Sequence, residues 1–172
     1  NANRKREHNA MILQQIEHPY DVTVIGGGHA GCEAALAAAR MGARTLLITL
    51  ELDSVALAPC NPAIGGPAKS IVVREVDALG GAMGEITDSA QIQIRMLNTS
   101  KGPAVRALRA QIDKALYQRK MGEKLRSQPG LDLLEGEVAS LEREVAGLTA
   151  CRLTDGRRVE TKTAVLCAGT YL

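Results

Sequence analysis

Aromatic residues are nearly absent from this chain of 172 residues. It contains no tryptophan and no phenylalanine, and aromatics make up 2% of the sequence. The core is therefore expected to be aliphatic, built on alanine, leucine, valine and isoleucine. The shortage also argues against folds that bind single-stranded nucleic acid by stacking bases on aromatic side chains.

Closely spaced cysteines, long apolar runs and a strong net charge are also missing. Cys32, Cys60, Cys151 and Cys167 form no CxxC pair, so no metal site is expected. The chain shows no signal peptide and no apolar run of membrane length, so we expect a cytoplasmic protein with free thiols. The net charge of +2 gives no indication of nucleic-acid binding.

The organisation expected from the sequence is one domain behind a short tail. Residues 1–19 begin with a polar, basic stretch and are expected to be a tail or a tag remnant. Residues 20–172 are long enough for a hydrophobic core. The sequence stops at Leu172, three residues after the apolar run "AVLCAG", so the domain is expected to be incomplete.

The first part of the domain predicts a βαβ unit. "YDVTVIGGG" is rich in valine and isoleucine, as a buried parallel strand is, and its glycines form a turn. "HAGCEAALAAARMG" is a helix by composition, and "ARTLLITLEL" is a second buried strand. The expected fold class is therefore α/β with a parallel sheet.

The middle of the chain predicts a loop, two helices and a short strand. A loop over 53–67 is followed by a helix with an apolar stripe of Ile71, Val72, Val76 and Leu79, ended by Gly80 and Gly81. "SAQIQIRML" alternates like a strand, and residues 104–125 predict one long amphipathic helix. The last third predicts an appended β-meander with a tight turn at Asp155–Gly156.

The glycine turn has the spacing of a phosphate-binding loop. Gly26, Gly28 and Gly31 match G-x-G-x-x-G between a strand and a helix, the context that gives this motif its meaning. Gly26 permits the tight turn, Gly28 lets the backbone approach a pyrophosphate, and Gly31 lets helix and strand pack closely. N–H groups at the helix start then face the anion. His29, between two of these glycines, is expected to be an exposed loop residue.

The residue that would bind the ribose has two candidates. In dinucleotide-binding folds an acidic side chain at the end of the second strand binds a ribose hydroxyl. The spacing from Gly31 places this position at Thr49, whose hydroxyl can replace the acid, and Glu51 follows two residues later.

Cys60 stands apart from the other three cysteines. Cys32, Cys151 and Cys167 are expected to be small buried residues. Cys60 lies in a loop rich in proline and glycine, shortly before a helix that begins near Gly66. A thiol near a helix N-terminus can have a lowered pKa and act as a nucleophile, although loop cysteines are often incidental.

Five segments together resemble a known family. They are "DVTVIGGGHAGCEAALAAARMGA", "CNPAIGGPAK", "REVDALGGAMG", "QIRMLNTSKGPAVRALRAQID" and "AVLCAGTYL". They are similar to the N-terminal part of the MnmG (GidA) family of FAD-dependent tRNA uridine 5-carboxymethylaminomethyl modification enzymes. The resemblance extends from about Tyr20 to Leu172, and the second and fourth segments are far more specific than the glycine loop.

The resemblance implies a fold, a reaction and partners. The fold would be a Rossmann-like FAD-binding domain of the glutathione-reductase type, here with the appended β-meander. Family members modify C5 of the wobble uridine of certain tRNAs together with an MnmE-type GTPase. The flavin carries a one-carbon unit from a folate, NADH reduces the flavin, and a homodimer is expected.

The resemblance also implies roles for individual residues. Cys60 matches one of two family cysteines that handle the uridine, either by attack on C6 or as an acid or base. The second would lie beyond Leu172, so the chain alone is expected to be inactive. FAD-binding positions are implied in the pyrophosphate loop, after the predicted long helix and in the cysteine motif: Gly26, Gly27, Gly28, His29, Ala30, Gly31, Val138, Asn61, Gly65 and Gly66. The ending "AGT" resembles a turn that returns to the cofactor.

Basic residues are concentrated between Gln91 and Arg126. This stretch has nine lysines and arginines against two acids, an excess of 9 − 2 = +7. Such a surface can neutralise phosphates, although it can equally be a solvated helix face. Lys101, Arg106 and Arg109 lie in or near the family motif and are the candidates for substrate contact.

Two other functions remain open on the sequence alone. One is a general FAD-dependent oxidoreductase of a small molecule, against which "CNPAIGG" argues. The other is a noncatalytic remnant of the fold.

Overall fold

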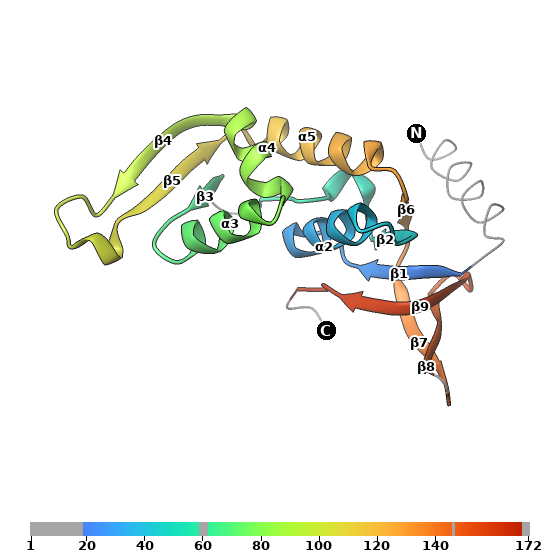
Figure 1. The fold of residues 1–172 in the computed structure, drawn as a ribbon. Helices are drawn as coiled ribbons and strands as arrows, with labels where there is room; N and C mark the ends of the chain where they lie inside the picture. The colour runs from blue at the N-terminus through green and yellow to red at the C-terminus, as the bar shows by residue number, and fades with distance from the viewer. Residues whose placement is uncertain (1–18, 59–61, 146, 170–172) are drawn as a thin grey trace. The chain divides into compact units, whose positions relative to one another are not determined.

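The computed structural model describes residues 19–58, 62–145 and 147–169. The described residues form two compact units (Figure 1). The first combines residues up to Val55 with those from Lys124 onward, and the second comprises residues 56–123. The expected boundaries, a tail over 1–19 and one domain over 20–172 with the cysteine loop and helix in 53–103, stay predictions.

The first unit is built on a six-stranded sheet, which confirms the predicted α/β fold with a parallel sheet and a β-meander. The strand order is β6-β2-β1-β9-β8-β7. β1 pairs in parallel with β2 and β9, and β2 pairs in parallel with β6. The strands are β1 (Tyr20–Ile25), β2 (Thr45–Thr49), β6 (Leu131–Glu135), β7 (Val138–Glu144), β8 (Gly147–Leu153) and β9 (Arg158–Leu166).

The core of this unit is aliphatic, as the composition predicts. Helix α2 (His29–Arg40) packs against β1 and β2. It buries Cys32, Ala35, Leu36 and Ala39, positions that share one helix face. Strand β2 is buried along its whole length, which explains why "TLLIT" shows no alternation. A second cluster joins sheet and meander through Tyr20, Leu46, Ile48, Leu134, Leu153 and Val159.

Strand β9 connects the parallel sheet to the meander. Its first residues pair antiparallel with β8, and Thr161–Leu166 pair in parallel with β1. β7 and β8 complete the meander, and the predicted turn at Asp155–Gly156 is confirmed. The parallel strands therefore run in the chain order third, second, first, fourth. In this order the connections leave β1 in opposite directions on its two sides, which makes the β1–β9 junction a topological switch point.

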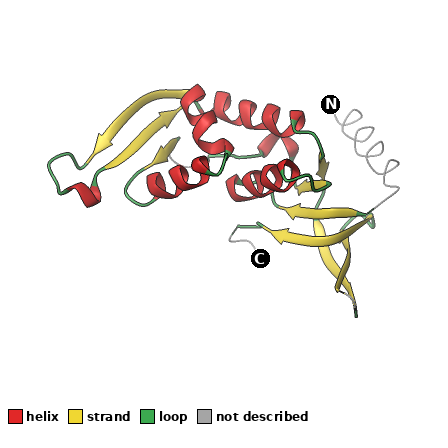
Figure 2. Ribbon diagram, in the orientation of Figure 1, coloured by secondary structure: helices red, strands yellow, loops and turns green. Residues whose placement is uncertain are grey.

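The second unit carries a smaller antiparallel sheet of order β3-β5-β4 together with helices (Figure 2). Short 3₁₀ turns occur at Leu52–Ser54, in the first unit, and at Pro103–Val105, in the second. The boundary between the units falls within α5. The elements are β3 (Ala63–Gly65), α3 (Lys69–Ala78), α4 (Ala82–Ala90), β4 (Gln91–Leu97), β5 (Ala107–Ile112) and α5 (Lys114–Ser127).

The predicted helix over 104–125 is wrong in its first half. Residues Ala107–Ile112 form β5, the central strand of the small sheet, and only Lys114–Ser127 are helical. "ALRAQI" consists of good helix formers, but pairing with strands on both sides outweighs this local preference. Asp113 begins the true helix, because its side chain accepts a hydrogen bond from the Leu116 N–H at 2.9 Å.

Two further expectations differ from the structure. Helix α4, which separates α3 from β4, was not predicted from the sequence. The apolar stripe on α3 was expected to face inward, but the side chains of Ile71, Val72 and Leu79 are at least half exposed. α3 packs against α4 and β3, and its buried residue is Ser70. Apolar spacing located this helix but not the face by which it packs.

Candidate functional site

The glycine loop follows β1 and is held in place by backbone contacts. The Gly26 N–H donates to the Ile48 carbonyl at 2.8 Å, and the Cys167 N–H donates to the Ile25 carbonyl at 2.8 Å. Gly26 has a φ of +110°, and a Cβ there would overlap the Cys167 carbonyl oxygen. Both facts require glycine at this turn, in agreement with its predicted role.

The loop then leads into α2, which begins at His29. A Cβ on Gly31 would overlap the Gly26 carbonyl oxygen, so Gly31 allows the close packing predicted for it. The N-cap, Gly28, has no side chain that could cap the helix. Apart from the adjacent residues of the chain, no heavy atom of the described residues lies within 4 Å of a Cβ built on Gly28. The start of α2 thus has no side-chain cap and lies next to open space at Gly28, the arrangement of a helix N-terminus that can bind an anion.

A cavity of about 720 Å³ adjoins this loop. It lies at the carboxyl ends of β1, β2, β6 and β9, where open parallel sheets bind their ligands. The volume falls within the range of small-molecule and cofactor sites. Its walls come from four connections of the first unit: Ile25–Gly28, Ile48–Glu51 with Ser54, Gly136–Leu141 and Leu166–Gly169.

Both candidates for the ribose contact line this cavity, but in different ways. Thr49 is the last residue of β2 and is 9% exposed. It lies beneath the loop, because a Cβ on Gly27 would come within 2.6 Å of its Oγ1. Glu51 is exposed, and its carboxylate accepts a hydrogen bond from the Ser54 hydroxyl at 2.8 Å. The geometry favours Glu51 as the residue that could reach a hydroxyl group.

The other predicted cofactor residues are distributed unevenly. Val138 lines the cavity, together with Gly26, Gly27 and Gly28. His29, Ala30 and Gly31 belong to the first turn of α2 and are not among its lining residues. His29 is half-buried, which corrects the expectation of an exposed loop residue. Contacts of all these residues with a cofactor stay predictions.

Sequence reasoning overlooked Glu137 and Cys167. Both line the cavity, and Cys167 follows the last residue of β9 instead of lying in the strand as expected. Ala168 and Gly169, from the "AGT" ending, line it as well. Their positions in the sequence could have identified both residues, because residues just after a parallel strand lie at the edge of the sheet where ligands bind.

The described cysteines differ in environment, and Cys60 and Asn61 lie outside the described residues. Cys32 is buried, and its Sγ donates to the Gly27 carbonyl at 3.4 Å. Cys151 is also buried, and burial raises the pKa of its thiol to about 11. These two are small core residues, as predicted, and Cys151 carries almost no thiolate at neutral pH. Cys167 is half-buried and lines the cavity, which corrects the expectation of a buried core residue.

The remaining predicted residues belong to the second unit. Gly65 is the last residue of β3, and the Gly66 N–H donates to the Leu108 carbonyl at 2.8 Å. Lys101, Arg106 and Arg109 are exposed, and an Arg106 Nη donates to the Thr99 carbonyl at 3.3 Å. Arg106 and Arg109 belong to the approach to β5 and to β5 itself, not to a helix. Their ligand contacts stay predictions.

The described residues contain no candidate metal site and no candidate membrane-spanning helix. Within residues 19–58, 62–145 and 147–169, no three His, Cys, Asp or Glu side chains are grouped so that they could hold a metal ion. None of the helices in those residues has the length and apolar character needed to cross a membrane.

Comparison with known proteins establishes the family. Residues 21–172 match the family described as glucose inhibited division protein A. The chain belongs to this GIDA family. The chain is 60% identical over 153 residues to the tRNA uridine 5-carboxymethylaminomethyl modification enzyme MnmG of Geobacillus thermodenitrificans. That alignment covers 89% of this chain and 24% of the Geobacillus protein. The predicted resemblance is confirmed, and the chain spans about a quarter of the length of this relative.

Solved structures agree with the family and with the fold. A crystal structure of Aquifex aeolicus GidA superimposes with a TM-score of 0.86 at 48% identity, over 90% of this chain and 26% of that chain. PqsL from Pseudomonas aeruginosa, described as a probable FAD-dependent monooxygenase, superimposes with a TM-score of 0.58 at 20% identity. That second alignment covers 86% of this chain and 42% of that chain, and it shows a shared fold only.

Proposed function

We propose that this chain is the FAD-binding part of an enzyme that modifies C5 of the wobble uridine in tRNA. Two lines of evidence support the proposal: membership of the GIDA family and high identity to proteins named as tRNA uridine modification enzymes. The likeness to PqsL is too distant to favour oxidation of a small molecule. The motif "CNPAIGG" supports the same choice, because it is part of the family resemblance and is far more specific than the glycine loop.

The observation that carries the cofactor assignment is the cavity beside Gly28. The open space there admits a phosphate group, whereas the space beside Gly27 is filled by Thr49. The adjoining α2 N-terminus supplies N–H donors, and Glu51 lies two residues after the end of β2. These features fit a dinucleotide that contains adenosine, as FAD does.

Three of the four walls of the cavity have distinct tasks in this proposal. Gly26–Gly28 and the α2 N-terminus hold the pyrophosphate, whose negative charge the helix dipole stabilises. Glu51 accepts a hydrogen bond from a ribose hydroxyl, and the backbone at Val138 contacts the adenine. Bound FAD supplies the redox and one-carbon chemistry that the family resemblance implies.

The remaining components belong to the whole protein. Cys60 handles the uridine, as a nucleophile at C6 or as an acid or base. We further propose NADH as the reductant of the flavin and a folate as the source of the one-carbon unit. An MnmE-type GTPase is the proposed partner, and the protein acts as a homodimer in the cytoplasm.

A complementation experiment tests the proposal. A strain that lacks the full-length protein receives the wild type, Cys60→Ser or the control Cys151→Ala. The wild type and the control should restore 5-carboxymethylaminomethyluridine in tRNA, measured by mass spectrometry. Cys60→Ser should restore none while the purified variant retains flavin. Unchanged modification with Cys60→Ser would refute the role of the cysteine, and a wild type that restored no modified nucleoside would refute the enzyme assignment.

A further inference from the structure

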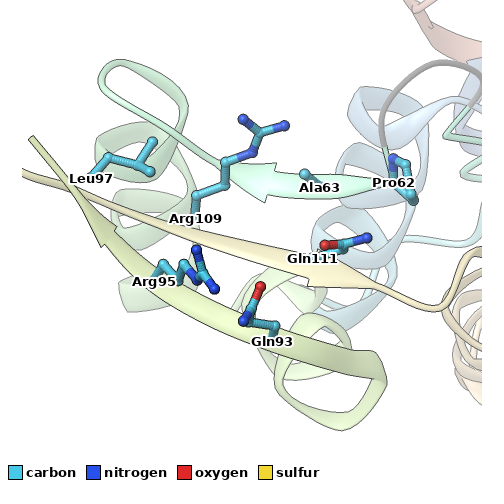
Figure 3. A pocket seen from close by; sticks show the side chains of 7 residues that line it. All are labelled: Pro62, Ala63, Gln93, Arg95, Leu97, Arg109 and Gln111. Atoms are coloured by element: carbon cyan, nitrogen blue, oxygen red, sulfur yellow. The ribbon is translucent and has the colours of Figure 1, made fainter.

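A second pocket lies on the small sheet of the second unit (Figure 3). Its volume is about 270 Å³. This is slightly below the range of about 300–1,000 Å³ for sites that enclose a whole small molecule. The pocket therefore suits one chemical group of a larger ligand. It is lined by Pro62, Ala63, Gln93, Arg95, Leu97, Arg109 and Gln111.

The sheet register places two arginines side by side. Arg95 on β4 pairs with Arg109 on β5, and Gln93 pairs with Gln111. Directly paired residues and residues two apart share a face of the sheet, so all four side chains lie on one face. Like charges directly opposite each other destabilise an antiparallel pair. Among the described residues, no carboxylate forms an ion pair with either arginine.

The Arg95 side chain is held by its neighbour. When the Gln93 amide is oriented to satisfy both groups, its oxygen accepts hydrogen bonds from Arg95 Nη2 at 3.0 Å and from Nε at 3.2 Å. This contact fixes the guanidinium without neutralising it. The donors that Gln93 does not engage remain available to a ligand, and a planar guanidinium binds oxyanions through such paired donors.

The third strand provides the space next to Arg109. The β3 residues that pair with Gln111 and Arg109 are Ala63 and Gly65, which have the smallest side chains. Gly65 has a φ of +107°, and a Cβ there would overlap the Leu108 carbonyl oxygen, so a larger residue is excluded. In Figure 3 the Arg109 side chain extends from β5 alongside β3. The result is a shallow hollow with two positive charges and two amides on its wall.

We propose that Arg95 and Arg109 together bind one phosphodiester group of the substrate RNA, close to the uridine that is modified. The inference rests on the proposed tRNA function. RNA is favoured over a small acid because five of the seven lining residues belong to the basic stretch Gln91–Arg126, with its excess of +7. A series of cations matches a polymer with repeating phosphates. Pro62, which lines the pocket, is two residues after the proposed catalytic residue Cys60 in the sequence.

The test measures RNA binding by the full-length protein. The ligand is a fluorescent, unmodified anticodon stem-loop with uridine at the wobble position, titrated at several salt concentrations. The proteins are the wild type, Arg95→Gln, Arg109→Gln, the double variant, and Arg74→Gln as a control. Arg74 is an exposed arginine on α3 outside the pocket, so its loss controls for the change in net charge.

Each single variant should weaken binding by roughly threefold to tenfold and reduce the salt dependence by about one unit of slope. The double variant should lose less than the product of the two single losses, because both arginines contact the same phosphate. None of these variants should unfold at a lower temperature than the wild type, since each removes a repulsion between like charges.

A second experiment identifies which phosphate is bound. It also distinguishes failure of this inference from failure of the proposed tRNA function. One phosphate of the stem-loop next to the wobble uridine is replaced by an uncharged methylphosphonate. This replacement should weaken RNA binding by the wild type as the arginine variants do, and it should weaken binding by the double variant no further. If Arg95→Gln and Arg109→Gln bind RNA like Arg74→Gln, the inference is wrong although the proposed function stands. The inference is also wrong if the two variants bind RNA like Arg74→Gln and lose only the competition of inorganic phosphate with RNA. A wild type that bound no RNA would contradict both.

Discussion

The backbone of Gly26 lies directly against the carbonyl group of Cys167, so closely that a Cβ on Gly26 would overlap the Cys167 oxygen. The hydrogen bond from Cys167 N–H to the Ile25 carbonyl, 2.8 Å long, reinforces this contact. Two walls of the proposed cofactor cavity, one near each end of the described chain, are thus joined through backbone atoms. The shape of the cavity therefore depends on the absence of side chains at Gly26 and Gly31.

Gly31→Ala should destabilise the protein and weaken FAD binding. The added Cβ would overlap the Gly26 carbonyl oxygen, so α2 or the loop must shift. Overpacking of this kind typically costs about 1–3 kcal/mol. Thermal unfolding of the full-length protein without flavin measures the first effect, and a flavin titration measures the second. A variant that matched the wild type in both would show that the loop tolerates a larger residue.

Cys167 and Cys151 should respond differently to alkylation. Cys167 is half-buried and lines the cavity, so iodoacetamide should modify it in the flavin-free protein and bound FAD should slow the reaction. Cys151 should resist the reagent at pH 8 with or without FAD, because burial raises the pKa of its thiol to about 11. Peptide mass spectrometry gives both rates. Equal protection of the two cysteines, or none at Cys167, would contradict this placement.

Tyr20→Phe should change how stability depends on alkaline pH. Tyr20 is fully buried and donates a hydrogen bond to the Asp132 carboxylate at 2.8 Å. Burial, followed by this hydrogen bond, raises the pKa of the Tyr20 phenol, while Arg44 partly opposes the shift. The protonated phenol thus stabilises the folded state fully below the unfolded pKa of about 10, and that contribution is lost as the pH rises above this value.

A comparison of the unfolding of the wild type and Tyr20→Phe at several pH values tests the direction of this pH dependence. At pH 8 the variant should be less stable by about 0.5–1.5 kcal/mol, the contribution of one buried hydrogen bond. Between pH 10 and 11 the gap between the two unfolding midpoints should narrow, because only the wild type gains from ionising when it unfolds. A gap that stayed constant or widened would show that the tyrosine does not titrate as its contacts imply.

The parallel sheet was predictable because its local and tertiary signals agree. "YDVTVIGGG" and "TLLIT" are rich in β-branched and aliphatic residues, and they form strands buried in the sheet. The glycine spacing located the turn and the start of α2, and Gly31 has the packing role expected from the motif. In this part of the chain, each local preference favours the structure that the whole fold requires.

The second unit was less predictable because its local preferences conflict with its pairing. "ALRAQI" favours a helix locally but pairs with β3 and β4, so Arg109 lies opposite Arg95 on a sheet. No spacing rule within one segment reveals such a cross-strand neighbour. The register depends on pairing between segments distant in the sequence, and the hollow beside the arginines depends on the small Ala63. Asp113 was the usable signal, because an aspartate before a helical run marks a helix start.

The most direct test of the central claim is FAD binding by full-length Gly28→Ala, with Gly102→Ala as its control. Both glycines have a φ that alanine adopts, −71° and −62°. Apart from the adjacent residues of the chain, no heavy atom of the described residues lies within 4 Å of a Cβ built on either. Both variants should therefore fold normally.

At Gly28, however, the added methyl group enters the space assigned to the pyrophosphate. Fluorescence titration of the flavin-free proteins should show affinity for FAD reduced by on the order of tenfold or more in Gly28→Ala, comparable to losing one charge-assisted hydrogen bond to phosphate. Gly102→Ala should bind like the wild type. Equal affinity in the two variants would contradict the assignment of this cavity to FAD.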